Sequence, residues 1–365
     1  HLKALGFGIQ GKVSETHQTL LVQIPSYRAT KDVNIEDDLV EEIARIYGYE
    51  NLPAILPVLP SRVPKPNTAR RQKHQARTLL AGLGLTESMN YSFYSKAVLA
   101  RYELDEHKHV KLLNALSEEQ SHLRSTLVPN LLKSLREAVK TDPDAGLFEM
   151  GRVFEKTKDF MPTEEKRLAF ALHFTNKDLP FFAAKGLLES FCEVFGVSGL
   201  QVNHKENPLS YMHPAQSADL ELRGKVIGTL FTVHPALAAL EDFVGRLAVC
   251  ELNFEALAAA QKSNKSYKET SKFPAIHFDV SFSIDRRKTV REIENALLKK
   301  GPKILKNLRL FDIYEGDKIE AGKKSLAFSL TLQAEDRTLT GSDLEEAQKL
   351  TWKILEDLGA QIRGK

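Results

Sequence analysis

Residues Ile24–Pro53, IPSYRATKDVNIEDDLVEEIARIYGYENLP, predict one short amphipathic helix around which the N-terminal part of the chain folds. Apolar side chains recur at helical spacing and predict a buried stripe. They are Leu39, Val40, Ile43, Ile46 and Tyr47. Acidic side chains three and four residues apart crowd the opposite face. They are Asp38, Glu41 and Glu42.

The crowded carboxylates have two explanations. Asp32 lies just outside the helix and can fold back toward the patch as a fourth oxygen donor. The repulsion is relieved by Arg45, by the dipole at the helix N-terminus, or by a bound hard cation such as Mg²⁺. Acids in a first turn are also ordinary chemistry for the start of a helix, and composition alone favours that explanation.

Composition indicates a globular protein. A chain of 365 residues with 42% hydrophobic and 27% charged residues predicts two or three domains. A net charge of +3 permits a local nucleic-acid-binding patch without requiring one. Cys192 and Cys250 predict buried free thiols in a reducing compartment. No run approaches a membrane span and the opening HLKALGFGIQ is unlike a secretion signal, so we expect a cytoplasmic protein with no membrane partner.

The first residue is His rather than Met, which suggests a piece of a longer protein. We expect a small α+β domain over residues 1–58, with strands at Ala4–Gln10 and Thr19–Ile24 before the acidic helix. The same layout suits a winged helix that binds DNA. A recognition helix presents basic or amide side chains to DNA, however, and this helix presents acids.

Prolines at 57, 60, 64 and 66 predict a stiff linker before a second domain at 67–262. Its strands are expected at Glu87–Tyr94, Val110–Leu113, Gly146–Phe154, Leu168–Phe174, Ser217–Leu222, Val226–Val233 and Leu247–Phe254. Its helices are expected at Thr68–Ala81, Leu123–Lys140 and Phe182–Phe195. Strands joined by turns such as Arg223-Gly224-Lys225 predict an antiparallel sheet with flanking helices.

A polar linker, Ser263–Lys272, precedes a third domain at 272–365. Its expected elements are an alternating strand from Phe278 to Ile284, a helix at Val290–Lys300, strands at Leu308–Tyr314 and Leu326–Leu332, a helix at Asp343–Leu358 and a strand at Ala360–Arg363. This βαββαβ order predicts a ferredoxin-like fold, and the whole chain is therefore a multidomain α+β protein. Ser342 and Glu345 suit a capping box for the last helix.

Three parts of the chain resemble the β subunit of bacterial-type phenylalanyl-tRNA synthetases. The first is Pro25-Ser26-Tyr27-Arg28, Asp32 and the run Asp38–Tyr49. The resemblance implies a Mg²⁺ site, shared with the family's α subunit, at Asp32, Asp38, Glu41 and Glu42. Shorter members have Arg and Asp nearly adjacent, whereas here Ala29, Thr30 and Lys31 separate Arg28 from Asp32.

The second part resembles a class II synthetase core. The matching segments are Asn114–Ser117, Leu123–Pro129, Leu147–Phe154, His213-Pro214 and Val233-His234-Pro235. Adenylate formation needs arginines on the phosphates, one of them after a Gly-rich strand. Arg124 and Arg152 could be mistaken for that pair, but Leu247–Leu252 is apolar and lacks such a strand. We therefore predict a fold without an active site and an ion pair between Glu149 and Arg152, with His213 and His234 as turn residues.

The third part resembles the family's anticodon-binding domain. The matching segments are Phe273–Ile276, Leu310–Gly316, Lys324–Ala327 and Arg337–Thr340. A basic run lies at the strand end and first helix: Arg286, Arg287, Lys288, Arg291, Lys299, Lys300, Lys303, Lys306 and Arg309. The first four are the predicted tRNA contacts. The family usually has basic residues at His277 and Phe278, and a solvated charged face is the alternative.

The resemblance implies the C-terminal portion of a phenylalanine-tRNA ligase β subunit, with the oligonucleotide-binding and editing half absent. Its expected partners are a catalytic α subunit, which binds ATP, and tRNA(Phe), in an (αβ)₂ tetramer. The alternatives are a stand-alone RNA- or DNA-binding module and a self-contained class II ligase.

Overall fold

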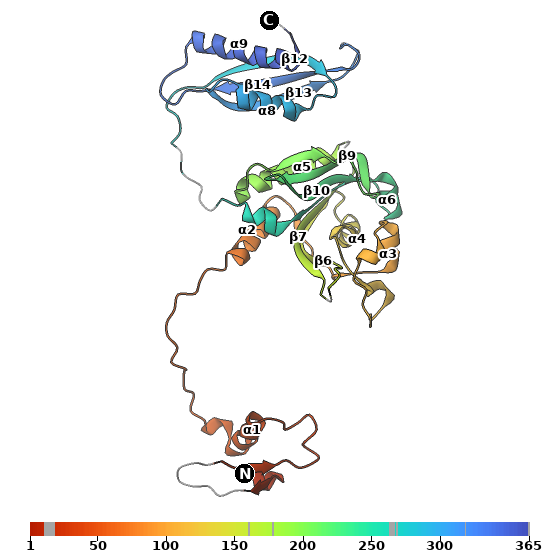
Figure 1. Ribbon diagram of the computed structural model, residues 1–365, viewed down its shortest axis with the longest axis vertical. Helices are drawn as coiled ribbons and strands as arrows, with labels where there is room; N and C mark the ends of the chain where they lie inside the picture. Colours follow the sequence, from red (N-terminus) through yellow and green to blue (C-terminus); the bar gives the residue numbers. More distant parts are fainter. Residues whose placement is uncertain are drawn as a thin grey trace. The chain divides into compact units, whose positions relative to one another are not determined.

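The computed structural model describes residues 1–10, 19–159, 161–176, 179–262, 267, 269–317 and 319–363. The chain divides into two compact units, His1–His74 and Gln75–Lys365 (Figure 1). Both mix helices with mainly antiparallel strands, which confirms the predicted α+β class. Among the described residues, no helix is both long and apolar enough to span a bilayer.

The first unit is a small hairpin with one helix. A 3₁₀ turn, Leu2–Leu5, precedes β1 (Gly8–Gln10), which pairs antiparallel with β2 (Leu21–Gln23). The predicted strand Ala4–Gln10 is therefore mostly wrong, because Gly6 has φ 86° and ends the turn in the left-handed region. Helix α1 (Glu36–Tyr47) follows, with a short 3₁₀ turn at Tyr49–Asn51.

The predicted buried stripe on α1 is largely wrong within this unit. The core comprises Leu2, Phe7 and Val33, and Leu39 is the stripe residue that packs against it. Val40 is 60% exposed and Tyr47 is 52% exposed. A hairpin with strands of three residues is too small to cover the full length of α1, so most of the apolar face of this helix stays in water.

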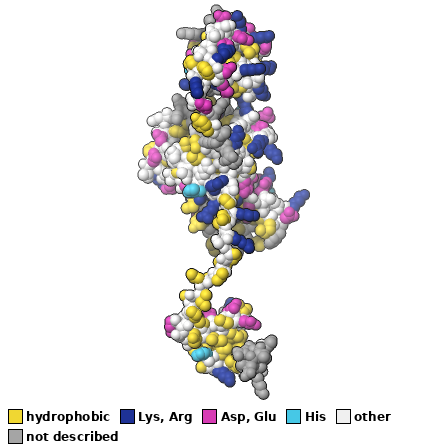
Figure 2. Space-filling view, turned by 90° about the vertical axis from the view of Figure 1, so that its left-hand side faces the viewer, with side chains coloured by type: hydrophobic (Ala, Val, Ile, Leu, Met, Phe, Trp, Pro, Cys, Tyr) yellow, Lys and Arg dark blue, Asp and Glu magenta, His cyan; other side chains and the backbone are white. Residues whose placement is uncertain are grey.

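Residues 53–67 contain no helix or strand, and every side chain in this linker is exposed. Hydrophobic side chains follow one another along it (Figure 2). Val58 is 100% exposed and Val63 is 96% exposed. Proline fixes φ and removes a backbone donor, which explains the extended path. Helix α2 (Thr68–Gly82) begins where the prolines end.

A seven-stranded sheet forms the centre of the second unit, in the order β3-β6-β7-β11-β10-β9-β8. The strands are β3 (Thr86–Glu87), β6 (Gly146–Glu155), β7 (Thr163–Phe174), β8 (Gln201–His204), β9 (Met212–Leu222), β10 (Lys225–Val233) and β11 (Arg246–Asn253). All neighbours are antiparallel except β3 and β6, which are parallel.

Helices cover both faces of this sheet. On one face, α2, α5 (Pro180–Phe195) and α7 (Phe254–Ala259) pack on a core that includes Phe148, Phe170 and Cys250. On the other face, α4 (Val128–Ala138) and α6 (Pro235–Leu240) pack on Phe231 and Val249. Adjacent residues alternate between the faces, as a strand period of two requires.

Three expectations for this unit need correction. Glu87–Tyr94 is not one strand, because β3 ends at Glu87 and β4 (Phe93–Tyr94) pairs instead with β5 (His122–Leu123). Val110–Leu113 forms an isolated bridge, Lys111 to His122. Helix α4 begins at Val128 rather than Leu123. Leu123 belongs to β5, and Pro129 suits the first turn of a helix. A further helix, α3 (Lys96–Arg101), lies between β4 and β5.

The C-terminal elements are β12 (Ile276–Asp285), α8 (Val290–Lys300), β13 (Leu305–Tyr314), β14 (Lys323–Leu332), α9 (Gly341–Asp357) and β15 (Gln361–Arg363). The antiparallel sheet order β13-β14-β12-β15 confirms the ferredoxin-like prediction. Both helices pack on one face, through Ile293 and Ile354 against Phe282 and Phe328. The capping box is Thr340 with Asp343 rather than Ser342 with Glu345, because α9 begins at Gly341.

Candidate functional site

The predicted metal ligands Asp32 and Glu42 are both engaged by Arg28. Arg28 Nε lies 2.7 Å from Asp32 Oδ2, and Arg28 Nη2 lies 2.8 Å from Glu42 Oε1. Arg45 Nη2 contacts the other Glu42 oxygen at 2.7 Å. Glu42 is only 6% exposed. The hydrogen bonds from Arg28 and Arg45 lower the pKa of Glu42 to about 2, and Arg45 was a foreseen partner whereas Arg28 was not.

Asp38 caps the start of α1. Its Oδ2 accepts hydrogen bonds from the backbone N–H of Asn34 at 2.7 Å and of Ile35 at 3.0 Å, which lower the pKa of Asp38. Glu41 is exposed. Within the described residues, no three His, Cys, Asp or Glu side chains converge in a way that could hold a metal ion. The four carboxylates as arranged here therefore do not fit a Mg²⁺ site by themselves.

A buried ion pair lies in the centre of the second unit. Arg124 Nη1 lies 2.6 Å from Glu149 Oε1, and each side chain is 3% exposed. Arg124 Nε donates to the Arg152 carbonyl at 2.9 Å, and Asn90 Nδ2 donates to Glu149 Oε2 at 2.8 Å. A Cβ at Gly151 would lie 2.2 Å from Arg124 Nη2, so glycine makes room for the guanidinium.

The predicted pair between Glu149 and Arg152 is wrong. Residues three apart on a strand point to opposite faces, and Arg152 instead contacts Glu164 across the β6–β7 hairpin at 2.8 Å. Arg124 and Arg152 are thus both engaged by carboxylates. Of the two histidines, His234 caps α6 as a turn residue, whereas His213 lies within β9.

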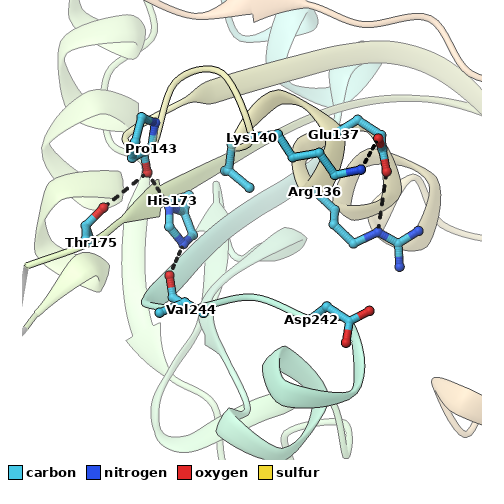
Figure 3. Close-up of a pocket in the computed structure, with 9 residues that line it drawn as sticks. Arg136, Glu137, Lys140, Pro143, His173, Thr175, Asp242 and Val244 are labelled. Atoms are coloured by element: carbon cyan, nitrogen blue, oxygen red, sulfur yellow. Dashed lines mark hydrogen bonds and ion pairs between the residues drawn. The ribbon is translucent and has the colours of Figure 1, made fainter.

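A cavity of about 610 Å³ opens between α4, the end of β7 and the loop after α6 (Figure 3). His173 lies in it with Nδ1 2.5 Å from the Pro143 carbonyl oxygen and Nε2 2.7 Å from that of Val244. Lys140 Nζ contacts Glu137 Oε2 at 2.5 Å. His173 is thus held by two backbone carbonyls and Lys140 by Glu137, which leaves these two side chains little capacity to bind a ligand.

The open face of the C-terminal sheet carries a shallow depression of about 440 Å³. Its lining residues come from three strands: His277, Asp279, Asn307, Arg309, Phe311, Ser329 and Thr331. His277 Nδ1 lies 3.1 Å from Thr331 Oγ1, and Phe311 is 49% exposed. Exposed aromatic and polar groups on a four-stranded sheet are the means by which such folds stack and read single-stranded RNA bases.

Sequence reasoning did not assign this face. The available signal was the alternation of buried Phe278 and Val280 with exposed His277 and Asp279 on β12. That pattern marks one face of a strand, but the pairing of β12 with β14, and of β14 with β13, is needed to bring the three rows together.

The four predicted tRNA contacts lie around the start of α8. Arg286 Nε contacts Glu315 at 3.1 Å and Lys288 Nζ contacts Glu292 at 3.3 Å. Arg291 Nη1 donates to Asn203 Oδ1 at 2.6 Å, and Arg287 is exposed. Lys299, Lys300 and Lys303 lie at the other end of this helix, about 16 Å away at 1.5 Å per residue. The basic run therefore does not form one continuous patch.

Comparisons with known proteins cover nearly the whole chain. Residues 1–49 match the family described as "tRNA synthetase B5 domain", residues 52–254 match "Phenylalanyl tRNA synthetase beta chain CLM domain" and residues 271–363 match "Ferredoxin-fold anticodon binding domain". A phenylalanine–tRNA ligase β subunit of Bacillus subtilis is 33% identical over 99% of this chain and 46% of its own length. One from Listeria innocua is 33% identical over 98% of this chain and 44% of its own length.

The chain thus spans about half the length of these relatives. A solved pyrrolysyl-tRNA synthetase from Desulfitobacterium hafniense is 14% identical, with a TM-score of 0.44 over 60% of this chain and 72% of that one.

Proposed function

We propose a function from one premise, that this chain belongs to the phenylalanyl-tRNA synthetase β-chain family. As the C-terminal portion of such a β subunit, it supports ATP-dependent attachment of phenylalanine to tRNA(Phe). The observation that carries the proposal is the set of three family matches, which follow one another along the chain. We keep the domain division 1–58, 67–262 and 272–365.

We propose that a separate α subunit catalyses the attachment of phenylalanine and binds ATP. We also propose that the assembly is an (αβ)₂ tetramer in the cytoplasm. The central ion pair favours a non-catalytic role for this chain. Arg124 and Glu149 neutralise each other, so the arginine is not available to bind a phosphate. A first test is to co-express the chain with its cognate α subunit. Co-elution supports the proposal, and failure to associate contradicts it.

The C-terminal sheet face is proposed to read anticodon bases. Phe311 offers a stacking surface, and Asn307, Ser329 and Thr331 offer donors and acceptors beside it. Base stacking is worth about 1–3 kcal/mol per base, so Phe311→Ala should weaken tRNA binding by about five- to 150-fold. The same substitution should reduce the preference for the native anticodon over an altered one.

The predicted contacts at the start of α8 give a different signature. If Arg286, Arg287 and Lys288 contact phosphates, replacing all three by Ala should lower the salt slope of binding by about one unit per residue. The preference for the native anticodon should persist. Anisotropy titrations of the complex over a salt series, with native and altered anticodons, separate the two. Leu350→Ala, on exposed apolar surface of α9, is the control. A Phe311→Ala variant with unchanged affinity and anticodon preference would contradict base reading by this face.

The Mg²⁺ ligands Asp32, Asp38, Glu41 and Glu42 stay a prediction. A cation there requires Arg28 to release its carboxylates or the α subunit to supply oxygen donors. Replacing Asp38, Glu41 and Glu42 by their amides should abolish any rise in melting temperature that Mg²⁺ gives the complex. Amides at the nearby exposed acids Glu36, Asp37 and Glu50 should leave that rise intact. A rise of wild-type size in the first variant would place the ion elsewhere.

A further inference from the structure

The segment between Glu50 and Glu87 holds basic residues and no acidic ones. Its basic residues are Arg62, Lys65, Arg70, Arg71, Lys73 and Arg77. The whole chain has 51 Lys and Arg against 48 Asp and Glu, so without these six it would have 45 against 48. The chain's net positive charge therefore resides in this one segment.

Four of these side chains are uncompensated. Arg62, Lys65, Arg70 and Arg71, here called the basic ribbon, are exposed, and none makes an ion pair with another described residue. Arg77, by contrast, contacts Glu87 at 2.7 Å. Like charges that are this near one another repel. A polyanion that binds them relieves the repulsion and releases its own counterions.

The backbone arranges the basic ribbon as a line. Residues 53–67 have no helix or strand, so Arg62 and Lys65 lie up to about 10 Å apart on an extended chain. The side chain of Asn67 then accepts from the Arg70 backbone N–H at 2.9 Å, at the start of α2. Arg70 and Arg71 fall in its first turn, where the helix dipole adds positive potential. A row of charges on a narrow strip suits a phosphate backbone.

We propose that the basic ribbon binds RNA phosphates regardless of base sequence, as a contact separate from the C-terminal sheet face. This inference rests on the proposed function, which supplies a tRNA as the RNA. An anionic membrane is the less suitable polyanion, because a helix that lies on a bilayer needs a free apolar face. On α2, Ala76 and Leu80 are fully buried in the core of the second unit and Leu79 packs against it, so the exposed apolar residues of this helix are the small Ala69 and Ala81. The exposed apolar side chains Val58 and Val63 lie on the linker, which contains no helix.

The test compares two variants that lose the same charge. One carries R62Q, K65Q, R70Q and R71Q, and the control carries K133Q, K225Q, K349Q and K353Q, all at exposed positions. Each is co-purified with the α subunit and titrated with labelled tRNA(Phe) transcripts, with native and altered anticodons, over a KCl series. Vesicles of phosphatidylglycerol are titrated in parallel.

At about 0.7–0.9 per phosphate, four lost contacts should lower the salt slope of the ribbon variant by about three units. Its affinity at low salt should fall at least about tenfold, equally for both transcripts, with the control unchanged. A slope equal to that of the control overturns the inference, as does lost vesicle binding with unaltered tRNA binding. Failure of the proposed function is distinguishable, because the wild-type complex would then not discriminate the anticodons whatever the ribbon variant does.

Discussion

Glu149→Gln should destabilise the second unit strongly. The substitution keeps the shape of the side chain but leaves the Arg124 guanidinium, 3% exposed, without the counter-charge that now lies 2.6 Å away. Removing one partner of a buried ion pair costs about 3–5 kcal/mol. At about 2–4 °C per kcal/mol for a domain of this size, calorimetry should show a melting temperature lower by about 6–20 °C.

Two further variants identify the cause. Glu255→Gln breaks the exposed pair with Lys166, 2.7 Å apart and 46% and 57% exposed, and should cost less than about 1 kcal/mol. The double variant Arg124→Met/Glu149→Leu replaces both charges by apolar groups and should recover most of the lost stability, because no uncompensated charge remains buried. Two results would contradict this explanation. One is an equal melting temperature for Glu149→Gln and Glu255→Gln, and the other is a lower melting temperature for the double variant than for Glu149→Gln.

Two other outcomes are expected of the isolated chain. The hydrogen bonds from Arg337 and then Thr340 hold the pKa of Asp343 below its usual range, so its contribution to stability is complete above about pH 4 and is lost as the pH falls; melting curves against pH should be flatter below pH 4 for Asp343→Asn, and an unaltered slope would contradict this. Gly228→Ala should cost about 1–3 kcal/mol in chemical denaturation, because its Cβ would lie 2.2 Å from the Glu251 carbonyl oxygen across β10 and β11. The control Gly186→Ala has nothing within 4 Å of its Cβ and should be neutral or stabilising, and equal costs for the two would exclude the clash.

The local spacing of apolar side chains was enough to predict several helices and strands of this protein. The 3.6-residue spacing in Val290–Lys300 predicted α8 to the residue, and period-two alternation from Phe278 to Ile284 predicted the central part of β12. The order of these elements was enough for the ferredoxin-like fold, because short connections and antiparallel pairing leave few alternatives. The acids of α1 were also located correctly on a helix.

Tertiary structure decided which charges meet. Arg124 reaches Glu149 across 25 residues and Arg28 reaches Glu42 across 14, whereas sequence spacing had paired Glu149 with Arg152 and gathered Glu42 with the other acids. Sequence proximity sets which residues are near along an element, but the pairing of strands and the path of loops set which side chains share a buried space. In a buried space the low dielectric strengthens the attraction between opposite charges, so each charged side chain pairs with the nearest counter-charge.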